Sequence, residues 1–196
     1  MVSQSTLALA CVAGVLLVPV RTIYAKQADN RRVCVVFQNV AGLPLDQVER
    51  VQTEVSRLFR QIDIELQWMA AMPADHSGVR MLAVTKYEPA DQSAPSAVMG
   101  FTQTVPGARG TRAYVFLPRV LRAARKFNVE VDRLMAAAAA HELGHTLLPD
   151  ASHHATGIMR APWDYFDLRE ASHGKLQFSP DTAALMQRGI ELAAKR

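Results

Sequence analysis

The chain has 196 residues, of which 49% are hydrophobic and 20% are charged, and its formal net charge is +4. This length suits one domain with a sizeable core, and the composition excludes a disordered or collagen-like chain. The basic residues are scattered along the chain, and their densest group lies within residues 119–126. This group has helical spacing and no interleaved aromatic residues. We therefore interpret it as a solvated helix face and expect no nucleic-acid partner.

An apolar segment comes first in the chain. Residues 6–20 carry no charge and are too few for the ~20 apolar residues of a membrane span, but they fit the apolar region of a secretory signal. The small residue Ala25 then offers a cleavage site, although residues 1–5 contain no Lys or Arg. We therefore predict a signal peptide over residues 1–25 and a secreted or periplasmic domain over residues 26–196, with no stable membrane span after cleavage. The alternatives are an uncleaved anchor and a buried apolar segment.

The sequence contains two cysteines. Cys11 would be removed with the signal peptide, and Cys34 would remain alone in the mature chain. No intrachain disulfide is then available, so we expect the fold to rest on its hydrophobic core rather than on a disulfide framework.

Strands and one helix are predicted in the first half of the domain. Residues 32–37 form a short, β-branched apolar run that is typical of a buried strand. Residues 46–62 repeat apolar positions every three or four residues, which predicts an amphipathic helix that Asp46 can cap. Residues 64–69 and 79–87 have strand-like alternation and predict two further strands.

The second half adds two strands and then helices. Residues 98–104 are a short strand-like island in a stretch rich in Pro, Gly, Ser and Ala, and residues 112–117 predict another strand. Residues 118–127 and 131–148 predict two helices. Pro149 stops the second of them, and the chain beyond it is expected to be loop.

A last amphipathic helix is predicted to run from a cap at Ser179, Pro180 and Asp181 to about Ala194. We find no internal repeat and no linker in the sequence. Because most of the strands precede most of the helices, this order of elements predicts one α+β domain.

The clearest functional signal is the sequence HELGH at residues 141–145, within the predicted helix 131–148. His141 and His145 are four residues apart and therefore share a helix face, about 5–6 Å apart at Cβ, which lets both imidazoles reach one zinc ion at ~2.0–2.1 Å. Glu142 is displaced around the helix and can reach a water on that zinc without being a ligand. Zinc lowers the pKa of its water to ~7, and a carboxylate beside it can take the proton.

The surroundings of this pattern matter, because chance would produce it in about one chain in a hundred of this composition. Five alanines, residues 136–140, precede it and allow close packing under a sheet. Gly144 costs roughly 1 kcal/mol in a helix interior, which indicates a close approach by other atoms. Four of the six histidines lie between residues 141 and 154. These features favour a functional site over coincidence.

A catalytic zinc needs a third protein ligand and an open position. Because Pro149 ends the helix and turns the chain back, a residue a few positions later can reach the metal. The candidates are His153, His154, Asp150 and, further along the chain, His173. The spacing alone leaves the choice among them open.

Residues 141–147, HELGHTL, and residues 157–159, GIM, resemble the metzincin zinc peptidases, especially the matrixin-like branch. In that family a helix supplies two histidines, a third follows on a loop, and a turn carries a methionine beneath the zinc. Met159 stands eighteen residues after His141, a spacing similar to that of matrixins. The close resemblance is confined to this part of the chain.

The chain departs from the family pattern at two positions. Metzincins usually carry Gly and then His after the second histidine, where this chain has Leu148 and Ala151. Residues 141–163 look similar to a group of uncharacterised exported bacterial metzincin-like proteins, in which the third histidine stands where His153 does. The resemblance therefore implies His153 rather than His154 as the third ligand.

Together with the motif, the resemblance implies a zinc metalloendopeptidase with Zn2+ held by His141, His145 and His153. Glu142 would be the general base that deprotonates the zinc-activated water and passes the proton to the leaving amine. The implied fold is a compact α+β metzincin-like zincin fold, with a twisted mixed sheet over the active-site helix. The implied partner is a peptide or protein substrate that pairs with a sheet edge, at residues 98–104.

Other residues carry weaker expectations. We interpret Met159 as packing beneath the site, and Trp163, Tyr165 and Phe166 as core or cleft wall. In placement, Tyr165 resembles a tyrosine that steadies the oxyanion in some metzincins, although ordinary packing is the simpler interpretation. We interpret His173, beside a glycine, as a turn residue.

Two other functions fit the same sequence. One is a non-catalytic exported zinc-binding protein, which a closed fourth ligand from His154 or Asp150 would indicate. The other is a zinc hydrolase that acts on a non-protein substrate of the cell envelope.

Overall fold

The computed structural model describes residues 31–73, 78–88, 98–104, 111–150 and 152–193. The predicted signal peptide, residues 1–25, lies outside the described residues. Among the helices that are described, none has the length and apolar character needed to cross a bilayer.

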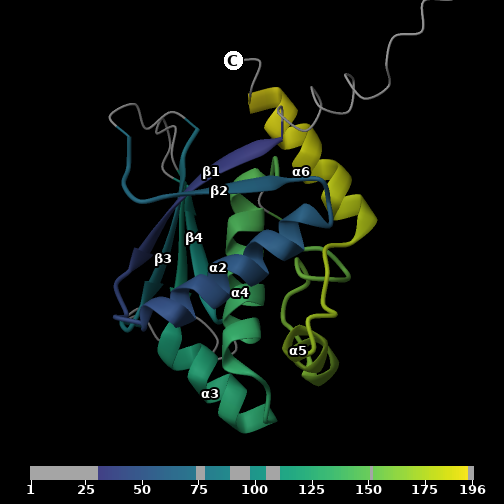
Figure 1. Ribbon diagram of the computed structural model, residues 1–196. Helices are drawn as coiled ribbons and strands as arrows, with labels where there is room; N and C mark the ends of the chain where they lie inside the picture. The colour runs from purple at the N-terminus through teal and green to yellow at the C-terminus, as the bar shows by residue number, and fades with distance from the viewer. Residues whose placement is uncertain (1–30, 74–77, 89–97, 105–110, 151, 194–196) are drawn as a thin grey trace, which may run out of the picture.

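The described residues form a five-stranded mixed sheet and five helices (Figure 1). The strands are β1 (Arg32–Asn39), β2 (Glu65–Met69), β3 (Arg80–Thr85), β4 (Gly100–Thr104) and β5 (Thr111–Phe116). The helices are α2 (Leu45–Arg60), α3 (Leu117–Phe127), α4 (Val131–Leu147), α5 (Tyr165–Ser172) and α6 (Pro180–Ala193). The prediction of a mixed sheet combined with helices is thereby confirmed.

The strand order in the sheet is β2-β1-β3-β5-β4. β1 is parallel to β2 and β3, and β3 is parallel to β5, whereas β4 is antiparallel to β5. In this register Gly100 lies opposite Val115, and Thr102 lies opposite Ala113. Because β5 is the sole partner of β4 among the described strands, β4 lies at one edge of the sheet that these strands form.

Helix α4 lies at the centre of the core. It contacts β3, β4 and β5 of the sheet and is flanked by α2, α3, α5 and α6 (Figure 1). Alternate strand residues point into this core, so that Val35, Leu82 and Val115 are fully buried. The alanines at residues 136–140 are at most 3% exposed. Their small side chains let the helix and its neighbours approach closely, which confirms the predicted close packing.

The expectation of loop after Pro149 is wrong in one place, because residues 165–172 form α5. The carboxylate of Asp164 accepts hydrogen bonds from two backbone N–H groups of the first turn, and the carboxylate of Asp167 accepts one from the backbone N–H of Asp164. This reciprocal arrangement is a capping box. It is built here from two aspartates instead of the usual Ser or Thr with Glu or Gln, so the pattern is easily overlooked.

The start of α2 also differs from the prediction. Asp46 does not cap this helix, because the helix begins one residue earlier and its N-cap position is Pro44. The Asp46 carboxylate instead accepts a hydrogen bond from Arg50, one turn along the helix, at 2.7 Å. An acidic side chain in the first turn still complements the helix dipole.

The basic group on α3 is only partly a solvated face, so that interpretation is wrong for Arg119. The Arg119 side chain is 5% exposed and donates hydrogen bonds to Glu88 at 3.1 Å and to the backbone carbonyl of Val98 at 2.8 Å. Arg122 donates to the same Glu88 at 2.7 Å. The hydrogen bonds from Arg122 and Arg119 lower the pKa of Glu88 to about 2. Arg119 therefore ties the chain just before β4 to helix α3.

Candidate metal centre

Helix α4 carries both histidines of the predicted helical pair and holds them in place. It begins after Glu130, whose carboxylate accepts hydrogen bonds from two backbone N–H groups of the first turn. It ends two residues before Pro149, which cannot continue a helix. His141 and His145 lie one turn apart on this helix, and their side chains face the same way.

His141 is oriented by the backbone of the turn behind it. Its Nδ1 lies 2.7 Å from the carbonyl oxygen of Ile158, and because a carbonyl can only accept, Nδ1 carries the proton. Its Nε2 is then unprotonated and lies 3.1 Å from Nε2 of His145. Burial lowers the pKa of His141 to about 4, so this ring is neutral near pH 7. A neutral imidazole is the form that ligates a metal.

The structure brings His153 to the same place. Its ring centroid is 5.3 Å from that of His141 and 4.9 Å from that of His145. One nitrogen from each of the three rings lies within 4.8 Å of the others. The three side chains could therefore hold one metal ion.

The other predicted ligands lie elsewhere. Within the part of the chain that the structure describes, the group that could hold a metal includes neither His154, Asp150 nor His173. The backbone of His154 forms an isolated β-bridge with Arg160. Asp150 accepts a hydrogen bond from the hydroxyl of Ser152 at 2.9 Å. His173 forms the C-cap of α5, which confirms the interpretation of this residue as part of a turn.

Met159 packs directly beneath the histidine-bearing helix. It is fully buried, and a Cβ atom on Gly144 would lie 2.5 Å from its sulfur and 2.8 Å from Cε of Met186. Gly144 is therefore the residue that lets both methionines approach α4. This confirms the predictions that Gly144 marks a close approach and that Met159 is a packing residue.

We expect Gly144→Ala to destabilise the protein by about 1–3 kcal/mol, although Ala stabilises an ordinary helix by roughly 1 kcal/mol relative to Gly. The added methyl would overlap Met159 and Met186 and force the core to shift. Chemical denaturation of the metal-free protein measures this change, with Thr53→Ala on the exposed face of α2 as the control, expected within about 0.5 kcal/mol of wild type. An unchanged or higher free energy of unfolding for Gly144→Ala would contradict the prediction.

Glu142 is buried beneath β4. The hydroxyl oxygen of Thr102 lies 2.7 Å from Oε2 of Glu142 and 2.8 Å from its backbone carbonyl oxygen. A Cβ atom on Gly100 would lie 2.5 Å from Cγ and 2.6 Å from Oε1 of Glu142, so this position has no space for a side chain. Burial raises the pKa of Glu142 to about 7, and the hydrogen bond from Thr102 opposes that rise. A carboxyl group with such a pKa can both accept and release a proton near neutral pH.

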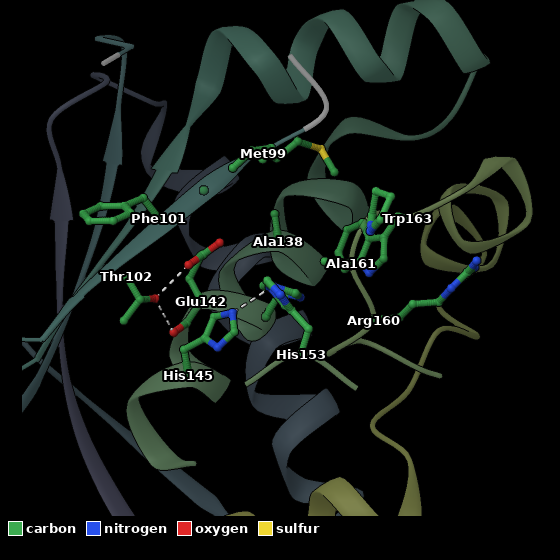
Figure 2. A pocket seen from close by; sticks show the side chains of 14 residues that line it. Met99, Phe101, Thr102, Ala138, Glu142, His145, His153, Arg160, Ala161 and Trp163 are labelled. Atoms are coloured by element: carbon green, nitrogen blue, oxygen red, sulfur yellow. Dashed lines mark hydrogen bonds between the residues drawn. The ribbon is translucent and has the colours of Figure 1, made fainter. Parts of the chain in front are cut away.

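A cavity of about 680 Å³ opens beside these residues. One wall is formed by residues 98–102, which are the first three residues of β4 and the two before it, and the opposite wall is the segment of residues 160–163. Figure 2 shows Glu142, His145 and His153 between these walls, with Phe101 on one side and Trp163 on the other. The site is thus accessible to a ligand from solvent.

The interpretation of three aromatic residues as core or cleft wall is confirmed for one of them. Trp163 lines the cavity, and its indole N–H donates to the Ile158 carbonyl at 3.1 Å. Tyr165 is 46% exposed and packs against Phe127, and Phe166 is 71% exposed. Neither Tyr165 nor Phe166 lines the cavity. The interpretation is therefore wrong for these two, and an oxyanion role for Tyr165 gains no support.

Sequence reasoning missed Thr102 and Gly100, which contact Glu142 from another element. The sequence does contain a signal for Gly100, because a glycine inside a strand often marks a place where other atoms approach closely. Strand alternation then puts Thr102 on the same face as Gly100. The sequence holds no comparable signal that this face meets Glu142.

Neither protein-family models nor curated proteins give a match to this chain. What the site can do therefore follows from its own residues. Three imidazoles, a buried carboxyl group and an open cavity can together hold a metal ion, move a proton and admit a ligand.

Proposed function

We propose that the protein is an exported, zinc-dependent metalloendopeptidase of the metzincin-like type, with Glu142 as the general base. The observation that carries this proposal is the place of Glu142, which lines the cavity together with His141, His145 and His153. A site that only stores a metal ion has no use for a proton acceptor there.

The donor set fits zinc. Neutral imidazoles are preferred zinc ligands, and three protein ligands leave the open position that a catalytic zinc requires. The carbonyl of Ile158 holds the proton of His141 on Nδ1, and such a hydrogen bond orients a ligating histidine. His141, His145 and His153 would hold the ion. When bound, zinc would supply Lewis acidity, which polarises a carbonyl and makes a water molecule more acidic.

Glu142 would perform the proton transfers of peptide hydrolysis. It would accept a proton from the attacking water and then pass that proton to the departing amine nitrogen. Because Glu142 and His141 are neighbours on one rigid helix, their relative position is well defined, which favours catalysis through orientation.

An extended peptide is the substrate class that the cavity favours. β4 borders the cavity and lies at one edge of the sheet that the described strands form, and an extended peptide can add to such an edge through backbone hydrogen bonds. Met99, Phe101 and Trp163 offer apolar surface to its side chains. A histidine pair on a helix, a third histidine on a loop and a methionine beneath them agree with the metzincin resemblance.

Zinc content and peptide cleavage test this proposal. We expect about one zinc per chain after purification without added metal, measured by elemental analysis. We also expect cleavage of a peptide library that a chelator abolishes and added zinc restores. Zinc near zero without uptake on addition would contradict the metal site. Full zinc occupancy without cleavage would favour a non-catalytic zinc-binding protein, and cleavage of only a non-peptide envelope substrate would favour another hydrolase.

A further inference from the structure

Thr102 lies on β4 and contacts the general base of the proposed reaction. Strand alternation turns Thr102 and Gly100 toward α4, where the hydroxyl of one and the empty side-chain position of the other both meet Glu142. In Figure 2 a dashed line joins Thr102 to the carboxylate of Glu142, and a second joins it to the backbone oxygen of the same residue. Two residues of the edge strand thus define the space that this carboxylate occupies.

The hydroxyl of Thr102 has one proton and two acceptors within reach. Oε2 of Glu142 is 2.7 Å away and the backbone carbonyl oxygen of Glu142 is 2.8 Å away. That carbonyl belongs to a helix interior, where it already accepts from the helix backbone. A hydrogen bond to an ionised carboxylate is roughly twice as strong as one between neutral groups. The proton of Thr102 therefore goes to Oε2 whenever Glu142 is charged.

This hydrogen bond makes the two oxygens of Glu142 unequal. Oε2 is occupied by Thr102, whereas Oε1 lies beside Gly100, in space that a side chain would fill. A glutamate side chain has several rotatable bonds, and in a buried site only specific contacts select one orientation. With one oxygen held, the other is left to accept a proton in a defined position.

We propose that Thr102 is a positioning residue that holds the Glu142 carboxylate by Oε2, so that Oε1 faces the attacking water. Because Thr102 belongs to the edge strand that would pair with the substrate, the same strand both receives the peptide and orients the base. This inference rests on the proposed peptidase function. Thr102 itself would not contact the reacting atoms.

Hydroxyl removal tests the proposal by kinetics. We expect Thr102→Val to lower kcat about tenfold, a part of the 10²–10⁴-fold that a general base contributes, with KM changed by less than about twofold. Thr102→Ser keeps the hydroxyl and should restore kcat to within about threefold of wild type. Zinc content should equal that of wild type in all variants. Equal kcat for Thr102→Val and wild type, or equal losses in Thr102→Val and Thr102→Ser, would overturn the proposal.

Thr146→Val is the matched control. Thr146 is also buried and donates its hydroxyl to a backbone carbonyl of α4, that of Leu143, at 2.6 Å. This variant removes a hydroxyl that donates to Leu143 and not to the carboxylate of Glu142, so we expect its kcat within about twofold of wild type. If kcat fell as much in Thr146→Val as in Thr102→Val, loosening of α4 would explain the losses in both variants.

Crystal structures of zinc-loaded wild type and Thr102→Val decide the proposal even if no peptide is cleaved. We expect the hydroxyl of Thr102 within hydrogen-bond distance of one oxygen of Glu142 in wild type, and a rotated carboxylate in the variant. An unchanged carboxylate in Thr102→Val would overturn the positioning role. Absence of cleavage by wild type together with the expected rotation would instead count against the peptidase function alone.

Discussion

Replacing Glu142 by Gln is expected to lower the rate of peptide hydrolysis at least about a hundredfold, because general-base catalysis contributes ~10²–10⁴-fold to the rate. The variant should retain the fold and the bound zinc. Gln has nearly the same shape as Glu and can still accept a hydrogen bond from Thr102 through its carbonyl oxygen. Its amide cannot accept the proton of the attacking water. The expected loss is therefore in kcat, because the substrate would still bind to β4 and the cavity.

The control for this experiment is Glu49→Gln, which makes the same chemical change on the exposed face of α2. We expect wild-type kcat and KM for it. Zinc analysis and circular dichroism of both variants would show that metal and fold are intact. Equal cleavage by wild type and Glu142→Gln would exclude Glu142 as the base and would remove the main support for the proposed mechanism.

Glu142→Gln also makes a distinct prediction for the metal-free protein. Burial raises the pKa of Glu142 from 4.5 to about 7, so the folded state binds a proton that the unfolded state releases between these values. Wild type should therefore lose stability as pH rises from about 4.5 to about 7, and the variant should lack this contribution. Denaturant unfolding at pH 5 and pH 8 would measure it. An identical pH dependence in both proteins would contradict the burial of an ionisable group at this position.

His153→Ala is expected to weaken zinc binding at least about a hundredfold, whereas His154→Ala should keep most of the affinity. Loss of a group that merely supports a ligand typically costs 10–100-fold in metal affinity, so loss of a ligand should cost at least as much. Among the histidines that the structure describes, only His153 brings a ring nitrogen to those of His141 and His145. The neighbouring His154 serves as a control of equal chemistry, one position along the same loop.

Competition with a chromophoric zinc chelator measures the affinities of both variants. A heavy loss in His154→Ala with little loss in His153→Ala would move the third ligand by one position and leave the role of Glu142 unchanged. Small and equal losses would mean that neither histidine binds the ion, and Asp150→Ala would then be the next variant to measure.

The elements of the fold were largely predictable, because hydrophobic periodicity is a property of neighbouring residues. The five described strands and four of the five described helices lie where the pattern of apolar residues predicts them. The exception, α5, begins with an aspartate capping box and has exposed aromatic residues at its start. Apolar character suggested burial for Tyr165 and Phe166, but exposure depends on which neighbours cover a residue, and that is not a local property.

The sequence by itself determined the pair of histidines and the carboxyl group between them, because residues 141–145 lie within little more than one helical turn and their geometry is that of any α-helix. Only the tertiary structure decided which residues complete the site. His153 and His154 are adjacent, and the path of the loop after Pro149 brings the ring of the first to the pair. Thr102 is forty residues from Glu142, and their contact depends on the pairing of β4 with β5 and on the packing of α4 beneath them. Such contacts arise from the register and packing of separate elements, and no spacing within one segment encodes them.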